Sequence, residues 1–173
     1  GDRPHGEVIP LPGESPAKYA HLKGRWPGLH SFRGAREAAR QAYLQAGITD
    51  ALNQIDFAEV HDAYASSELQ TYEDLGFCMY GDGGPWVEQR GPYIGGQVPV
   101  NPSGGLIACG HPVGATGIMQ GVFALWQLQG AVGKHCGSDK TQVPGAKRGL
   151  IHSHAGTGTY ITVNILETPG GVR

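Results

Sequence analysis

Residues 101–117 read NPSGGLIACGHPVGATG, and this glycine-rich stretch carries the strongest structural signal in the chain. Gly105 and Gly110 have the spacing of a phosphate-binding loop, but His111 and Pro112 stand where that loop needs Lys followed by Ser or Thr. The start of the stretch also lacks the G-x-S-x-G pattern of serine hydrolases. It therefore excludes a nucleoside triphosphate site and a serine nucleophile, and leaves a histidine between a glycine and a proline.

Proline is favoured at the first position of a helix, so Pro112 is expected to place the His111 imidazole at a helix N-terminus. There the helix dipole opposes protonation, which predicts a neutral ring near pH 7. Four surrounding glycines let backbone or ligand come close, which favours a functional histidine over an ordinary helix cap. The helix is predicted over residues 113–129, with an inward stripe at Ile118, Val122, Leu125 and Trp126.

Helical and strand patterns alternate in the rest of the chain. A stripe of alanines after Ser31 predicts a helix that ends at Gly47. A further helix is expected at 66–75, and strands are expected at 55–60, 149–154 and 159–166. Interleaved helices and strands indicate an α/β layer fold. Residues 1–30 contain five prolines, which predicts an extended segment whose order depends on a neighbour.

The composition fits one compact domain: 173 residues, 39% hydrophobic, with a net charge of −2. Thirteen basic residues spread along the chain form no basic patch, which argues against nucleic acid or an anionic membrane as a partner. Three cysteines without a C-x-x-C pair indicate neither a disulfide framework nor a zinc ribbon, so a reducing, cytoplasmic setting is expected. No apolar run approaches the ~18 residues of a membrane span. The chain begins with Gly1 rather than Met, which leaves open that it is a piece of a longer protein.

The stretch 101–117 closely resembles the Asn-x-x-Gly-Gly…Gly-His-Pro-x-Gly-Ala-Thr-Gly signature in the C-terminal half of thiolases. The resemblance extends over residues 31–166. Two further blocks carry it: His-Asp-Ala-Tyr at 61–64, with Glu68 and residues 73–76 behind it, and GLIHSHAGTG at 149–158. The His-Asp form of the first block is similar to the sterol-carrier-protein-type and archaeal branches of the family.

The resemblance implies a thiolase-like C-terminal domain over residues 31–173, built as a mixed five-stranded sheet covered by helices on both faces. Residues 1–30 would be the extended segment that leads into it from a missing half or from a partner chain. Thiolases take their nucleophilic cysteine from the N-terminal half, and their active site lies where the two halves meet. This chain would therefore be active only with an N-terminal half or with a separate nucleophile-bearing subunit.

The family signature also implies roles for the histidines. His111 would polarise the thioester oxygen of the substrate and help to activate the nucleophile. His61 would complete the first oxyanion site, usually through water, although a histidine that caps a strand end is an alternative. His152 stands where typical thiolases have the cysteine that moves the α-proton, so it is either the base or a structural residue. The ring of Tyr64 is expected to pack, with its hydroxyl as an added acid near the site.

Other positions of the signature imply substrate contacts. His154 stands where the family usually has a small residue whose backbone N–H serves the second oxyanion site. A His-x-His metal pair with His152 is conceivable, but no third ligand has a fitting spacing, so no metal is expected. Cys109 is expected to pack in the core. The full set of expected substrate-binding residues is Asn101, Ser103, Gly104, Gly105, Gly110, His154 and Gly156.

Three functions compete at this point. The first is acyl-CoA C-acyltransferase chemistry in lipid metabolism, which forms or cleaves a β-ketoacyl-CoA with coenzyme A as substrate and no further cofactor. The second is a thiolase-like retro-aldol acyl-CoA lyase of the steroid side-chain type, favoured by the absent acid–base cysteine and by Tyr64. The third is a degenerate structural subunit that supports an active partner. In each case we expect a homo- or hetero-oligomer, such as a dimer.

Overall fold

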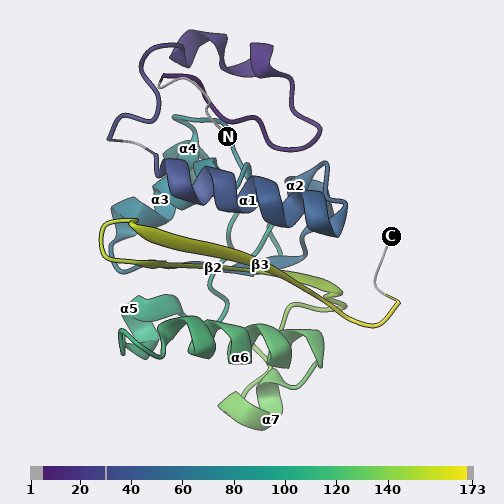
Figure 1. The fold of residues 1–173 in the computed structure, drawn as a ribbon. Helices are drawn as coiled ribbons and strands as arrows, with labels where there is room; N and C mark the ends of the chain where they lie inside the picture. Colours follow the sequence, from purple (N-terminus) through teal and green to yellow (C-terminus); the bar gives the residue numbers. More distant parts are fainter. Residues whose placement is uncertain (1–5, 30, 171–173) are drawn as a thin grey trace.

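The computed structural model describes residues 6–29 and 31–170 as an α/β domain with helices on both faces of one sheet (Figure 1). Residues 1–5, 30 and 171–173, which belong to the expected 1–30 segment and 31–173 domain, lie outside the described residues. The elements in chain order are η1 Pro16–Leu22, α1 Arg33–Ala46, α2 Ala51–Gln54, β1 Phe57–Glu59, α3 Ala65–Asp74, α4 Gly83–Glu88, α5 Gly105–Cys109, α6 Thr116–Leu128, α7 Val132–Cys136, β2 Arg148–Ala155 and β3 Tyr160–Glu167.

The sheet has the strand order β1-β2-β3. β1 runs parallel to β2, with Ala58 opposite Leu150, and β2 and β3 form an antiparallel hairpin. An isolated bridge joins Ala58 to Val100 on the other side of β1. The sheet is mixed, as expected. The five-stranded form is not confirmed, because the described residues form these three strands and two isolated bridges, Ala58–Val100 and Gly6–Trp26.

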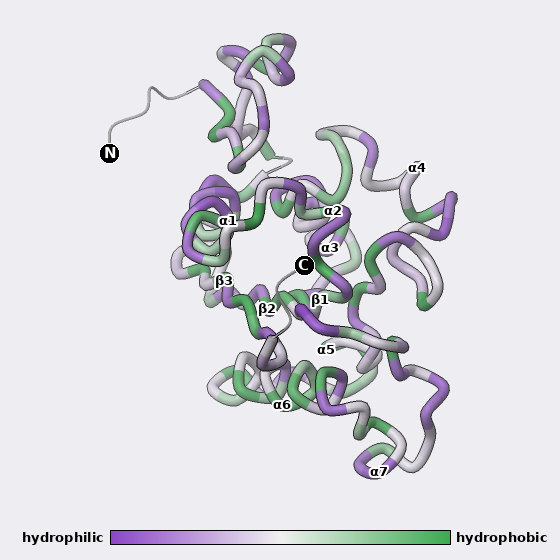
Figure 2. The backbone as a smooth tube through the Cα atoms, turned by 90° about the vertical axis from the view of Figure 1, so that its right-hand side faces the viewer, coloured by the Kyte–Doolittle hydropathy of each residue, from purple (hydrophilic) through white to green (hydrophobic). Residues whose placement is uncertain are grey.

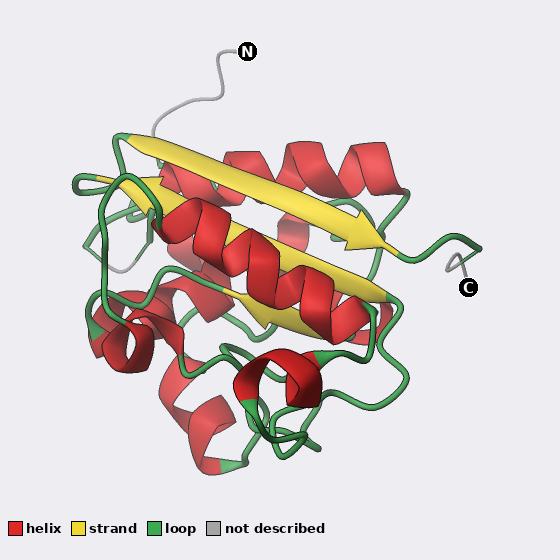
Figure 3. Ribbon diagram, turned by 90° about the horizontal axis from the view of Figure 1, so that it is seen from below, coloured by secondary structure: helices red, strands yellow, loops and turns green. Residues whose placement is uncertain are grey.

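The two faces of the sheet carry different helices, as Figure 1 shows. α1 lies against β3, with α3 beside it, while α6 crosses the other face against β2 (Figure 3). Ala35 and Ala39 are fully buried, so the expected alanine stripe lets α1 approach the sheet closely. Gly47 adopts a left-handed conformation at the end of α1, which is the predicted stop.

The polarity of α6 is the reverse of the sequence prediction. Its buried residues are Thr116, Gln120, Ala124 and Gln127. The stripe expected to face inward faces out instead, with Ile118 71% exposed and Val122 and Leu125 also exposed. The inward side fits because Ala124 allows contact with the core around Phe57, and Gln120 and Gln127 donate hydrogen bonds to the carbonyls of His152 and Thr141. Figure 2 shows the hydrophobic residues that run along this helix.

The segment before α1 is ordered by contacts within this chain. It contains η1 rather than only extended chain, and Val8, Ile9, Tyr19 and Trp26 cluster with Tyr80. Arg36 of α1 also holds the segment in place, and its side chain is 0% exposed. Its guanidinium donates to the Ile9 carbonyl, pairs with Glu14, and donates to the Tyr19 hydroxyl and to the carbonyls of Glu73 and Asp74 at the end of α3. Order in residues 6–29 therefore depends on α1 and α3.

Candidate active site

Four histidines from three parts of the chain meet beside the end of the sheet. His61 follows β1, His152 and His154 lie on β2, and His111 lies in the turn between α5 and α6. The ring centroid of His61 is 4.8 Å from that of His111 and 3.9 Å from that of His154, and the rings of His152 and His154 are 5.7 Å apart. The structure thus brings together residues that are up to 93 positions apart in the sequence, from His61 to His154.

His111 is the exposed member of the cluster. Its Nδ1 lies 2.7 Å from the Thr116 hydroxyl oxygen, and that hydroxyl donates to the Pro112 carbonyl at 3.2 Å. Because the hydroxyl hydrogen is already used, we assign a ring proton to Nδ1, and Nε2 is the nitrogen that can exchange a proton with a substrate. The helix begins at Thr116 rather than at Pro112, so His111 lies about one turn before the observed helix N-terminus and not directly at it, as predicted.

The other three histidines are held neutral. Burial, together with the neighbouring His154 and His111 rings, lowers the pKa of His61 to about 4. Burial also lowers the pKa of His152 to about 3 and lowers that of His154. Neutral imidazoles can donate one hydrogen bond and accept another, which suits proton transfer and the stabilisation of an oxyanion.

Several ring nitrogens of the cluster have no hydrogen-bond partner among the described residues. They are Nδ1 of His61, Nε2 of His152 and Nδ1 of His154. His152 is 0% exposed, and its Nδ1 lies 3.5 Å from the His61 backbone nitrogen. His154 is held between the rings of His61 and Phe32, whose centroid lies 5.4 Å away. A bulky side chain at this position therefore fills space next to His61.

The glycine-rich loop lies beside these rings, but two of its polar side chains bind the protein itself. Asn101 accepts a hydrogen bond from the Val60 N–H at 2.7 Å and donates to Glu68 at 3.0 Å. Ser103 donates its hydroxyl to Glu59 at 2.6 Å. A Cβ on Gly105 would come within 2.1 Å of a carboxylate oxygen of Asp62, which is why glycine is needed there.

The remaining positions of the expected site lie at the surface. Gly104 and Gly110 are exposed and have positive φ, and Gly156 is exposed in the β2–β3 turn with φ of 60°. Tyr64 precedes α3 and is 75% exposed, so the expectation that its ring packs is wrong. Cys109 is also exposed rather than in the core, because α5 turns that side toward solvent.

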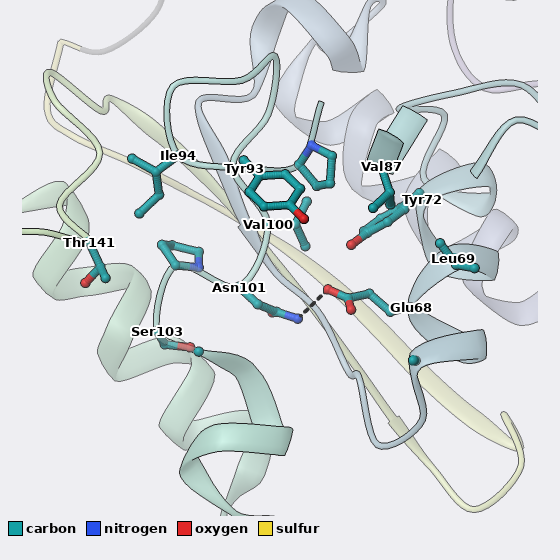
Figure 4. Close-up of a pocket in the computed structure, with 14 residues that line it drawn as sticks. Glu68, Leu69, Tyr72, Val87, Tyr93, Ile94, Val100, Asn101, Ser103 and Thr141 are labelled. Atoms are coloured by element: carbon teal, nitrogen blue, oxygen red, sulfur yellow. Dashed lines mark hydrogen bonds between the residues drawn. The ribbon is translucent and has the colours of Figure 1, made fainter. Parts of the chain in front are cut away.

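An open cleft of about 580 Å³ lies on the other side of the loop. Its walls are mostly apolar and aromatic, including Tyr72, Tyr93 and Val100, and the Glu68–Asn101 hydrogen bond lies within it (Figure 4). Asn101, Ser103 and Gly104 line this cleft, so they lie between it and the histidines.

Sequence reasoning missed the residues that support the site: Glu59, Asp62 and Thr116. All three are buried polar side chains. A charged residue inside the apolar run FAEV at 57–60 was the available signal for Glu59.

Two of the three thiols, those of Cys78 and Cys109, are held in the protonated form. Burial raises the pKa of Cys78 to about 12, and burial with nearby Glu59 raises that of Cys109. Across residues 6–29 and 31–170 no group of three or more His, Cys, Asp or Glu is arranged to hold a metal ion. In the same residues no helix has the length and apolar character needed to cross a bilayer.

Comparison with known proteins agrees with this geometry. The family model "Thiolase C-terminal domain-like" matches residues 19–168. Human "Sterol carrier protein 2" is 44% identical over 136 residues, which are 79% of this chain and 23% of that protein. "Acetyl-CoA acetyltransferase" of Methanothermobacter thermautotrophicus is 45% identical over 130 residues, which are 75% of this chain and 32% of that protein.

A solved structure has the same fold. "Ltp2-ChsH2(DUF35) aldolase" superposes with a TM-score of 0.67 at 23% sequence identity, over 84% of this chain and 35% of that chain. The match to the human and archaeal relatives spans about a quarter to a third of their length. With most of its length matched by the family model and its signature histidines gathered in one cluster, the chain belongs to the thiolase C-terminal domain-like family.

Proposed function

We propose that this chain supplies the proton-transfer and oxyanion groups of a thiolase-like acyl-CoA C-acyltransferase that forms or cleaves a β-ketoacyl-CoA. The observation that carries the proposal is the exposed His111 ring, 4.8 Å from a His61 ring whose pKa burial lowers to about 4. Coenzyme A is the substrate and no other cofactor is required. The proposed setting is the cytoplasm.

In the cleavage direction, the partner's thiol loses its proton to Nε2 of His111, and the thiolate attacks the β-keto carbonyl carbon. The oxygen becomes negative, and imidazole N–H groups of the cluster stabilise it. The carbonyl re-forms as the Cα–Cβ bond breaks, which leaves the acyl group as a thioester on the partner's sulfur, and the α-carbon next to the other thioester takes the proton that His111 holds. The thiol of coenzyme A then gives its proton to His111 and attacks the acyl thioester, and the departing thiolate of the partner takes that proton back.

We place the nucleophile on an N-terminal thiolase half or a separate subunit, and the raised pKa values of Cys78 and Cys109 disfavour those two thiols for the role. The outward apolar side of α6, formed by Ile118, Val122 and Leu125, supports such a partner. Exposed apolar patches of this kind mark protein contacts.

The test is turnover of a β-ketoacyl-CoA by the assembly of this chain with the polypeptide that co-purifies with it. His111→Ala is expected to reduce kcat by about 10²–10⁴, the usual contribution of a positioned general base. His21→Ala, at an exposed position on η1, is the matched control. An assembly that turns over equally well with His111→Ala would instead identify this chain as a structural subunit.

A retro-aldol acyl-CoA lyase is the second candidate. The exposed hydroxyl of Tyr64, three residues after His61, favours it because such a reaction needs an acid–base group but no acyl-enzyme. Intact mass spectrometry of the assembly after mixing with acyl-CoA separates the two. An acylated cysteine in the partner is expected for the acyltransferase, whereas the lyase forms none and loses activity in Tyr64→Phe.

A further inference from the structure

Glu59 is a buried carboxylate that binds one residue of the glycine-rich loop at two points. It lies at the end of β1 and is 1% exposed. One oxygen accepts the Ser103 N–H at 3.1 Å and the other accepts the Ser103 hydroxyl at 2.6 Å. The same hydroxyl oxygen accepts the Gly105 N–H at 3.1 Å, so the contact continues into the first turn of α5.

Two more carboxylates hold the same loop. Asp62 accepts the Leu106 N–H at 2.7 Å, and Glu68 accepts a hydrogen bond from the Asn101 side chain at 3.0 Å (Figure 4). Both acids lie on the segment that continues from β1 into α3. The loop is therefore attached at three points to the part of the chain that carries His61.

These acids are not stabilised by basic side chains. In the described part of the chain, the ion pairs involve Glu14, Glu37 and Glu167 instead. A buried carboxylate without a cation carries a large desolvation cost, and an apolar residue of similar size usually gives equal or greater stability. Packing alone therefore does not account for Glu59.

The geometry relates Glu59 to the histidines. Glu59 and His61 are two residues apart in extended chain, so their side chains leave the same side of it. Glu59 contacts Ser103 at the start of α5, and His61 contacts His111, which follows two residues after α5 ends. The carboxylate and the histidine thus fix the two ends of one short helix.

We propose that Glu59 is a positioning residue: through Ser103 and α5 it sets the separation of the His111 and His61 rings. Its effect on turnover rests on the proposed function, whereas its effect on the ring positions does not.

The charge state of Glu59 gives this role a measurable signature. Its pKa is raised to about 7, because burial and the nearby Asp62 and Glu68 outweigh the hydrogen bonds from Ser103, which lower it. Cys109 of α5 is the other titratable group that interacts with it. Protonation replaces one acceptor oxygen with a donor, so the contact with Ser103 changes near neutral pH.

The first experiment is NMR on the whole chain. In the wild type, the Ser103 and Gly105 amide resonances are expected to titrate with a midpoint near pH 7, and the His61 and His111 ring protons to show a nuclear Overhauser contact. Glu59→Gln should abolish the titration and keep the contact, because an amide still bridges to Ser103. Glu59→Ala should lose both, and Glu88→Gln, at an exposed position on α4, should change neither.

Ser103→Ala is the second variant, in case Glu59→Ala does not fold. It removes only the hydroxyl link, and it is expected to weaken the contact between the two rings. A ring contact of unchanged intensity in folded Ser103→Ala, or a Ser103 amide that does not titrate near neutrality, would overturn the proposal.

The second experiment is turnover by the reconstituted assembly. Glu59→Ala is expected to lower kcat about tenfold with little change in KM, and Glu59→Gln to restore most of it. If the wild-type assembly is inactive while the NMR result holds, the proposed function fails and the positioning role stands. A rise in KM for Glu59→Ala with an unchanged kcat would contradict the positioning role.

Discussion

His152 illustrates how burial fixes the protonation state of a single side chain. Its ring is fully buried, and the pKa of about 3 means that the folded state excludes its proton throughout the physiological range. In the unfolded chain the same ring binds a proton below about pH 6.5. Folding stability therefore falls as the pH drops below that value.

The His152→Asn variant should lose this dependence, because an amide does not titrate and its oxygen can still face the His61 N–H. Below about pH 6 the wild type is expected to lose about 1.4 kcal/mol of unfolding free energy per pH unit relative to the variant. Urea unfolding between pH 4.5 and 8 measures the difference, with His21→Asn as the control. Parallel curves for wild type and His152→Asn would contradict the buried, neutral ring.

Buried acids act in the opposite direction. Burial raises the pKa of Glu59 and of Asp74 to about 7, so the folded state binds their protons more tightly than the unfolded state does. Their contribution to stability is largest below about pH 4.5 and is lost as the pH rises through 7. The test of His152 therefore compares the wild type with a variant that keeps both Glu59 and Asp74, so that the effect of these two acids is the same in both chains.

The signature residues could be found from the sequence because their spacing is chemically specific. This spacing identified four histidines as site residues, and the structure places their rings in one cluster: His61, His111, His152 and His154. Glu59 was missed, since its partner Ser103 is 44 positions away and only the fold brings them together. Tyr64 was assigned a packing role by analogy with phenylalanine, but the contacts of its ring depend on what covers α3.

At the level of the element, α6 shows that the periodicity of apolar residues predicts a helix but not which of its sides faces the core. Its apolar stripe was clear, and the rule that apolar residues face the core gave the wrong side. The polar side of α6 can be buried because the Thr116 hydroxyl and the side-chain N–H groups of Gln120 and Gln127 make hydrogen bonds. Ala124 on the same side permits close packing against the sheet.

Two substitutions distinguish the two sides of α6. Ile118→Ala is expected to change the unfolding free energy by no more than about 0.5 kcal/mol, as at other exposed positions. Ala124→Leu, on the fully buried side, is expected to cost about 1–3 kcal/mol through overpacking. Chemical denaturation measures both, and a cost above about 2 kcal/mol for Ile118→Ala would restore the orientation that the sequence suggested.

For the whole molecule, alternating patterns and the family resemblance predicted an α/β domain with helices on both faces, and this is confirmed. Local patterns predicted strands at 55–60, 149–154 and 159–166, which correspond to β1, β2 and β3, whereas the number five came from the family resemblance and is not confirmed by the described residues. The outward side of α6 is the other whole-molecule feature, because its exposed apolar residues support the proposed contact with a partner.

The partner test replaces two residues on that side. Ile118→Glu combined with Val122→Lys keeps the net charge and sets an opposite-charge pair one helical turn apart, which supports the helix. We expect at least a tenfold loss of affinity for the companion polypeptide with an unchanged thermal midpoint. Leu44→Gln, at an exposed apolar position on α1, is the control, and equal affinity for all three chains would exclude α6 as the contact.

The buried guanidinium of Arg36 has a consequence for how the beginning of the chain responds to its surroundings. Its N–H groups are directed at three carbonyl oxygens, a hydroxyl and a carboxylate, and most of these partners carry no net charge. Dissolved ions screen attraction between exposed charges far more than directional bonds in a dry interior. A high salt concentration that weakens surface ion pairs is therefore expected to leave residues 6–29 packed against the domain.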